Sequence, residues 1–394
     1  MKTIFLFILN VIYSCQILAQ HPVTKLRIDP DNAFAGNTRD FFEEVNFIPL
    51  ETNEQSLFGK IYQLEVTDQY YIIYDSETNA ILLFHKDGKF HTKINKRKKN
   101  EFFSVFALDR KAKEIILPTI GNLILFYNYN GKLIKEKKSD LAFERLFFVG
   151  DSLYVLNQPR LLKKSETSRI SHDLVFTKDF KKSIMDFFPF DQKYQIMDYN
   201  LPIRLFSDQG DRTCYFSFPY NYNVFGISAT GITSEFQFLF PEKYSLPKDF
   251  STGEEFSSIR KEYVFNPLPQ NMDKFISLGP FFKYNEWILF EIQKIGGYIS
   301  NARDLLYNLE TKKLYSMNLI IGDEISNYFP VLQARKQQRM NSLYDGVLYT
   351  SISASSYMTI KKKILEDGLS IELPDMEKKA NPILIRSVFK KNNK

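Results

Sequence analysis

The twelve residues NAILLFHKDGKF, at 79–90, return as NLILFYNYNGKL at 122–133, and this repeat decides the fold. Five of the twelve positions are identical, and the offset between Gly88 and Gly131 is 131 − 88 = 43 residues. Each string carries Asp-Gly or Asn-Gly between two β-prone runs, which predicts a hairpin because glycine accepts the positive φ of such turns. Repeated hairpins at this period are typical of β-propeller blades.

The first two units each contain four strand patterns, which are IYQLEV, YYIIYD, AILLF and KFHTKI, and then VFALD, EIILP, LILFY and KLIKEK. Degenerate units follow at 144–188, 201–240 and 275–319, and a last unit runs from LYDGVLYTSIS to NPILIRSVFK. A strict period of 43 residues would allow eight blades in the mature chain, but the later units are longer. We therefore predict an all-β fold, a single six-bladed β-propeller of four-stranded antiparallel blades. Short helical insertions are expected at 254–263 and 355–367.

The segment VNFIPLE, at 45–51, has a strand pattern but no hairpin partner beside it. An unpaired strand edge is a liability that propellers avoid by closing their ring. We predict that 45–50 pairs with the C-terminal strand at 383–389, within one propeller domain that spans 45–394.

The first 19 residues have one lysine followed by a short apolar run from Ile4 to Ile12, which is typical of a secretory signal peptide. The run is too short to span a bilayer. Residues 20–44 would then form an N-terminal segment ahead of the propeller. In a second interpretation Cys15 is the lipidated residue of a lipoprotein. Both interpretations place the protein outside the cytoplasm, in the periplasm or at the outer membrane or cell surface of a bacterial envelope.

The composition narrows the possible partners. The net charge is only +6 and is spread along the chain, whereas nucleic-acid binders usually concentrate basic charge on one face, so we expect no nucleic-acid partner. If Cys15 is removed or lipidated, Cys214 has no cysteine left to pair with. Its place in the strand-like run RTCYFSF predicts a buried, inert thiol.

The common catalytic motifs are absent: the sequence has no H-E-x-x-H, C-x-x-C, P-loop, G-x-S-x-G or G-x-G-x-x-G. A propeller enzyme could still gather one catalytic group from each blade around a metal ion in the central channel. The inner strands of the first two units offer Glu65 and Asp109 for such a site, which are two candidates from six blades. We predict no cofactor and no catalytic residue, with a channel metal left open.

Two stretches of the sequence contain candidate binding residues. Lys96, Arg97, Lys98 and Lys99 form a basic run in the connection between the first two blades, which could attract an acidic ligand or could be a solvated loop. Tyr220 and Tyr222 lie in FPYNYN between two predicted strands, where a ring and a hydroxyl suit a sugar or a peptide. Packed aromatics in an ordinary turn are the alternative for this pair.

FIPLET at 47–52, GKI at 59–61, the DGKF-type hairpin and NPILIR near the C-terminus resemble a family of secreted six-bladed β-propellers of Bacteroidetes-type bacteria, which are similar to NHL-repeat propellers. That family has a G-x-G-P-G-E-Y/F loop after its first full blade. This chain reads NKRKKNEF there, at 95–102, and keeps only Glu101 and Phe102 of the loop. The resemblance implies the fold and export, and it implies no reaction.

Together these features favour an exported, non-catalytic binding or scaffold protein that recognises a protein, peptide or glycan on one face. It would act as a monomer or as part of an envelope complex. The alternative is a metal-dependent propeller enzyme, such as a lactonase-like hydrolase or a lyase, with its site in the central channel.

Overall fold

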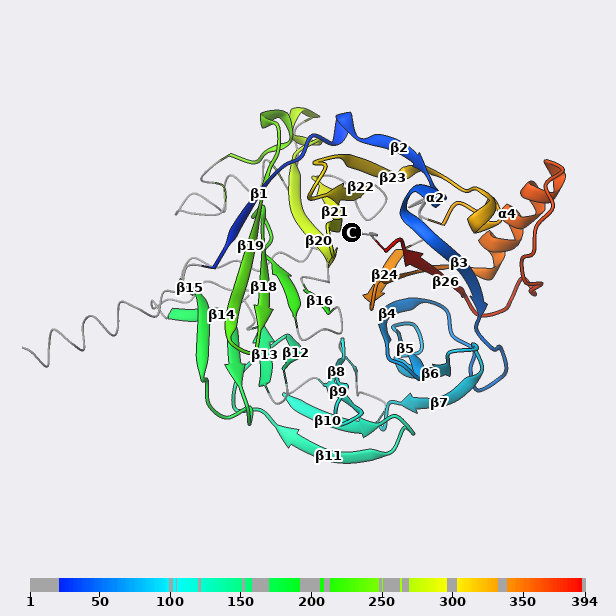
Figure 1. Cartoon of the computed structure of the whole chain (residues 1–394). Helices are drawn as coiled ribbons and strands as arrows, with labels where there is room; N and C mark the ends of the chain where they lie inside the picture. Colours follow the sequence, from blue (N-terminus) through cyan, green and yellow to red (C-terminus); the bar gives the residue numbers. More distant parts are fainter. Residues whose placement is uncertain are drawn as a thin grey trace, which may run out of the picture.

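The protein is a six-bladed β-propeller, as the repeat predicts (Figure 1). The computed structural model describes residues 21–98, 102–103, 105–119, 122–150, 153–157, 170–191, 206–208, 213–247, 250, 263, 269–295, 303–331 and 339–391. Six sheets surround a central axis, and within each sheet the strands of one repeat unit follow the chain outward from the inner strand.

The blades are numbered in chain order, with their strands given from the inner to the outer. Blade 1 contains β4 (Ile61–Val66), β5 (Tyr70–Asp75), β6 (Ala80–His85) and β7 (Phe90–Asn95). Blade 2 contains β8 (Ala107–Asp109), β9 (Glu114–Pro118), β10 (Leu123–Asn128) and β11 (Leu133–Lys138). Blade 3 contains β12 (Arg145–Val149), β13 (Leu153–Asn157), β14 (Ile170–Thr177) and β15 (Met185–Asp191).

The other three blades also include N-terminal strands. Blade 4 contains β16 (Phe206–Asp208), β17 (Cys214–Ser217), β18 (Asn223–Ser228), β19 (Gly231–Leu239) and β1 (Val23–Arg27). Blade 5 contains β20 (Phe275–Tyr284), β21 (Trp287–Lys294), β22 (Arg303–Asn308), β23 (Leu314–Ile321) and β2 (Phe34–Asn37). Blade 6 contains β24 (Arg339–Tyr344), β25 (Val347–Ile352), β26 (Ile383–Phe389) and β3 (Phe42–Pro49).

Two α-helices and four 3₁₀ helices are described, α2 (Thr38–Phe41), α4 (Ala354–Glu366), η1 (Pro30–Asn32), η2 (Glu242–Tyr244), η4 (Pro269–Asn271) and η6 (Glu324–Ser326). The helix predicted at 355–367 is therefore confirmed, and Ser353 caps it by accepting a hydrogen bond from the Ser356 amide. The helix predicted at 254–263 lies almost entirely outside the described residues.

The hydrophobic core is divided among the interfaces between neighbouring blades, because strand residues alternate between the two faces of a sheet. In blade 1, Ile73 and Leu82 pack toward blade 6, whereas Ile72 and Leu83 pack toward blade 2. Central strands buried on both faces therefore need the continuous apolar runs seen in the sequence. Cys214 is buried in β17 as a free thiol, which confirms its predicted burial.

The N-terminal strand β3 pairs antiparallel with β26, with Phe47 opposite Ile385, so the predicted pairing of these segments is present. Asn381, just before β26, is fully buried against the loop that follows β3. Its side chain donates to the Glu51 and Ser56 carbonyls at 2.7 and 2.9 Å and accepts from the Phe58 amide at 3.0 Å. The NPILIR and FIPLET segments thus contact each other where the ring closes.

The N-terminal segment also pairs with blades 4 and 5, which the sequence did not predict. Upstream of β3, strand β1 pairs parallel with the outer strand of blade 4, and β2 pairs parallel with the outer strand of blade 5. Residues 23–49 therefore run around the outside of three consecutive blades (Figure 1). Blades 4 and 5 consequently have five strands instead of the predicted four, and the edges of β19 and β23 are covered.

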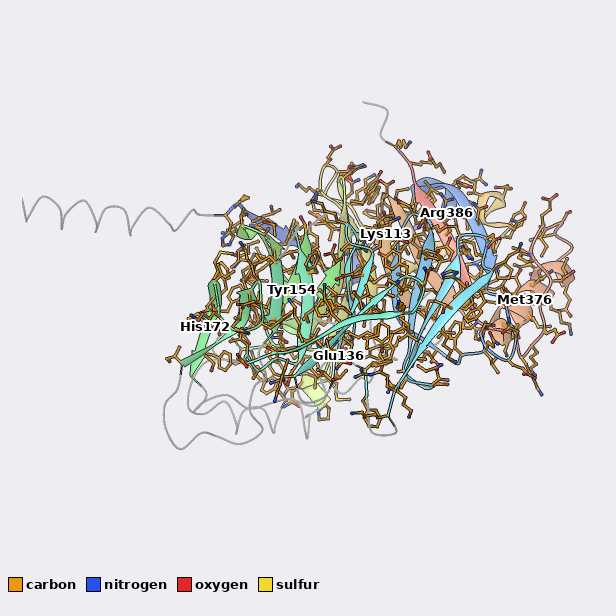
Figure 2. All side chains as sticks on the ribbon, turned by 90° about the horizontal axis from the view of Figure 1, so that it is seen from below. Lys113, Glu136, Tyr154, His172, Met376 and Arg386 are labelled. Carbon is orange, nitrogen blue, oxygen red and sulfur yellow. The ribbon has the colours of Figure 1, made fainter. Side chains whose placement is uncertain are left out.

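The two faces of the propeller differ in the connections that they carry. Each blade has one turn from its inner strand to its second strand and another from its third strand to its fourth. Both turns lie on the same face of the propeller, which we call the turn face. The opposite loop face carries the connections from each blade to the next. In the edge view of Figure 2, Lys113, after the inner strand of blade 2, lies toward the turn face, and Glu136 lies toward the loop face.

Candidate functional site

The predicted basic run lies on the loop face, between β7 and β8, where the sequence placed it. Arg97 forms an ion pair with Glu136 of blade 2, so its charge is balanced within the protein. The ammonium of Lys96 lies 5.9 Å from the centre of the Phe102 ring, whereas Lys98 is exposed. Lys99 lies outside the described residues. A binding role for this run stays a prediction.

The predicted tyrosines also lie on the loop face, between β17 and β18, and both rings have protein neighbours. The Tyr222 hydroxyl donates to the Phe275 carbonyl at 2.9 Å and accepts from the Leu246 amide at 2.8 Å. Burial raises the pKa of Tyr222 to about 12. The Tyr220 ring lies 5.1 Å from that of Phe250. These contacts fix the connection between blades 4 and 5, and a binding role for the pair stays untested.

The two carboxylates considered for a channel metal have other partners. Arg110 donates to Glu65 at 3.2 Å, and Gln63 donates to the other oxygen of the same carboxylate at 3.0 Å. Asp109 accepts from the Ala112 amide at 2.8 Å within the β8–β9 turn. Within the part of the chain that the structure describes, no group of three or more His, Cys, Asp and Glu residues could hold a metal ion. Cys15, the alternative lipidation residue, lies outside the described residues.

A different set of polar side chains gathers on the turn face, where blades 6, 1 and 2 meet. We call it the turn-face cluster, and it comprises Glu65, Asp68, Arg110, Tyr129 and Tyr344. The Tyr344 hydroxyl donates to Asp68 at 2.9 Å, and the Arg110 guanidinium lies 5.6 Å from the centre of the Tyr344 ring. Asp68 is exposed and Tyr344 is half-buried, so ring, hydroxyl and carboxylate can be reached from solvent.

Tyr129 has an unusual environment within this cluster. It is buried, and its hydroxyl has no hydrogen-bond partner in the described part of the protein. Burial raises its pKa to about 12, with smaller effects of Arg110, Asp109, Tyr344 and Glu65 that place the hydroxyl near the cluster. A buried hydroxyl without a partner costs about 1–3 kcal/mol. The hydroxyl is shielded from solvent, so a ligand atom would recover that cost only by displacing the side chains that cover it.

Lys86 extends the polar surface between blades 1 and 6. Its ammonium donates to the Thr67 carbonyl at 3.2 Å and lies 4.3 Å from the centre of the Tyr71 ring and 5.4 Å from that of Tyr349. Burial, with a smaller lowering effect of Arg386 and an opposing effect of Asp68, lowers the pKa of Lys86 to about 8. The amine is therefore held in a protein environment that disfavours its charge.

Lys86 should leave a signature in the pH dependence of stability. Between pH 8 and about 10 the unfolded chain keeps a proton on this amine that the folded chain releases, so stability should rise with pH across this window. Lys86→Met removes the titration, and we expect the stability of the wild type relative to this variant to increase from pH 8 to about 10. Urea titrations of both proteins at several pH values would measure it. A constant difference would contradict the lowered pKa.

The family model described as a domain of unknown function (DUF4934) matches residues 26–386. The chain belongs to this family. A solved structure of a candidate exported protein from Bacteroides fragilis superimposes with a TM-score of 0.67 at 15% identity, covering 93% of this chain and 100% of that one.

A second solved structure, a DUF4221 family member from Bacteroides vulgatus, has a TM-score of 0.50 at 14% identity and covers 89% of this chain and 97% of that one. No curated protein matches the chain. At these identities the structural matches establish the propeller fold alone. Among the described residues, no helix is both long enough and apolar enough to cross a membrane.

Four residues of the polar surface of this DUF4934 protein were not predicted from the sequence, and they are Arg110, Tyr129, Tyr344 and Lys86. The repeat contains a pattern that could have indicated three of them. Lys86, Tyr129 and Tyr344 each stand directly before an Asp-Gly or Asn-Gly pair. The glycines of these pairs have φ of 86°, 75° and 72°, as tight turns require. These three turns join the first strand to the second or the third strand to the fourth, so all three lie on the turn face, and the residue before each pair contributes to a shared surface.

Proposed function

We propose that this protein is an exported, non-catalytic binding or scaffold protein of a bacterial envelope, and that it holds a protein, peptide or glycan through the turn-face cluster. The observation that supports this most directly is the buried Tyr129 hydroxyl, which has no partner within the described residues. It lies near two groups at the surface, the Tyr344 ring and the Arg110 guanidinium.

The residue types of the cluster suit recognition. Tyrosine and arginine are the side chains most enriched among the residues that dominate binding energy at protein interfaces. A tyrosine offers an apolar face and a polar tip, which serves a sugar ring as well as a peptide. Asp68 and Arg110 add one carboxylate and one guanidinium, so a ligand that carries both donors and acceptors would be complementary.

Matched variants on the two faces test this proposal. Asp68→Asn with Tyr344→Phe removes a charge and a hydroxyl of the cluster with little change in packing. Lys96→Glu with Lys98→Glu reverses two charges on the opposite face. We expect the turn-face pair to weaken capture of a ligand from glycan arrays and envelope extracts by about tenfold, equivalent to about 1.4 kcal/mol. The loop-face pair should bind like the wild type.

The comparison of variants separates the outcomes. If only the loop-face variant, Lys96→Glu with Lys98→Glu, failed to capture a ligand that the wild type captures, the turn-face proposal would be overturned. The binding site would then lie at the basic run. A ligand bound equally by all three proteins would show that neither set of side chains recognises it, which also contradicts the proposal.

A further inference from the structure

Two of the four histidines of the chain lie together in the β6–β7 hairpin of blade 1. His85 is the last residue of β6, and His91 is the second residue of β7. Both imidazoles lie on the side of the sheet that faces blade 2, where they contact the Tyr70 ring at 5.1 and 4.8 Å between ring centres. His85 is exposed and His91 is half-buried, so the pair can be reached from solvent.

The spacing of the two rings fits a shared ion. A zinc–nitrogen bond of about 2.1 Å places the centre of a ligating imidazole about 3.2 Å from the metal. Two imidazoles on one ion would then have centres about 4.5 Å apart at a right angle and about 5.2 Å apart at the tetrahedral angle. The centres of His85 and His91 are 4.9 Å apart, and their planes make an angle of 72°.

Hydrogen bonding prepares His91 for this role. Its Nε2 lies 3.3 Å from Oδ1 of Asn130, which can only accept, so Nε2 carries the proton and Nδ1 keeps a free lone pair. Ligating histidines usually donate their second ring nitrogen to an oxygen in this way, which fixes the tautomer and the ring. Asn130 is itself held in the blade 2 turn, where its amide donates to the Asn128 side chain at 3.1 Å.

His85 has the complementary property. Its ring contacts Tyr70 and His91, but neither ring nitrogen makes a hydrogen bond to another described residue. Both nitrogens therefore remain available for a ligand. Tyr70 also contacts the Tyr129 ring, with 5.9 Å between the centres, so the hairpin pair lies beside the turn-face cluster but is separate from it.

We propose that His85 and His91 bind a divalent transition-metal ion of the zinc class through their imidazole nitrogens. Neutral imidazole suits Zn²⁺, Ni²⁺ and Cu²⁺, whereas Ca²⁺ and Mg²⁺ prefer oxygen. Two protein ligands leave the other coordination positions of the ion to water or to an incoming group. The site is on the turn face outside the central axis, so it differs from the channel metal considered in the sequence analysis.

Calorimetric titration of the tag-free mature protein with ZnCl₂ tests this site. We expect one zinc ion per chain, and we expect His85→Ala and His91→Ala each to lower the affinity by at least about tenfold. His172→Ala is the matched control, because this residue (Figure 2) lies in β14 of blade 3 whereas the pair lies in blade 1, and this variant should bind zinc like the wild type. Circular dichroism would confirm that all variants fold.

One further measurement concerns the role of Asn130. Asn130→Ala should weaken zinc binding by about tenfold, as losses of orienting groups commonly do. The proposal would be overturned if the wild type showed no saturable zinc binding. It would also be overturned if His85→Ala and His91→Ala bound zinc as tightly as the wild type.

Discussion

Replacing Asn381 by alanine is expected to lower the free energy of unfolding by about 3 kcal/mol. The side chain is fully buried, and its amide makes three hydrogen bonds to the backbone of the loop that follows β3. The Glu51 carbonyl keeps a second donor, because Ser56 Oγ also bonds to it at 2.7 Å. The Phe58 amide and the Ser56 carbonyl would lose the hydrogen bonds that Asn381 supplies, and each such group costs about 1–3 kcal/mol when it stays buried.

The loss should be large because it occurs where the ring closes. The Asn381 contacts join the segment before the C-terminal strand to the segment after the N-terminal strand, and no covalent connection crosses this interface. Urea denaturation followed by the fluorescence of Trp287, the single tryptophan, would measure the change. Circular dichroism of the same samples would test whether the other blades unfold in the same transition.

Asn46→Ala is the matched control for this experiment. Asn46 lies on β3 in the same blade, but its side chain is exposed, so its removal should change stability by no more than about 0.5 kcal/mol. If Asn381→Ala lowered the free energy of unfolding as little as this control does, the buried amide would not be what stabilises the ring closure. The pairing of β3 with β26 would then be what stabilises it.

The fold could be predicted from the sequence because the propeller repeats a local pattern. Each hairpin is specified by apolar alternation and an Asp-Gly or Asn-Gly turn within about a dozen residues, so single units could be recognised and then counted. The strands β1 and β2 lacked such a signal. The sequences VTKLR and FAGN have no hairpin partner, and their pairing with strands more than 200 residues away depends on the finished ring.

The candidate site was harder to predict for a related reason. Glu65 and Arg110 belong to different blades, and Tyr344 comes from the far end of the chain. Their contacts depend on the order in which blades close around the axis and on the register of each inner strand. The basic run at 96–99 was conspicuous in sequence because its charges are consecutive, whereas the turn-face cluster takes its residues from five separate turns and strand ends.

The second large effect is expected at the ion pair between Glu65 and Arg110 within this cluster, where the two partners are not equivalent. The Glu65 side chain is 7% exposed and that of Arg110 is 23% exposed. Arg110→Met would leave a carboxylate that water reaches poorly, and we expect a loss of about 2 kcal/mol in the free energy of unfolding. Glu65→Gln leaves a guanidinium closer to solvent and keeps an acceptor for Gln63, so its loss should be about 1 kcal/mol.

The double variant distinguishes this explanation from simple loss of packing. If the uncompensated carboxylate causes the damage, adding Glu65→Gln to Arg110→Met should restore about 1 kcal/mol, because the buried group is then neutral. A double variant less stable than Arg110→Met would show instead that the arginine contributes by stacking on Tyr344.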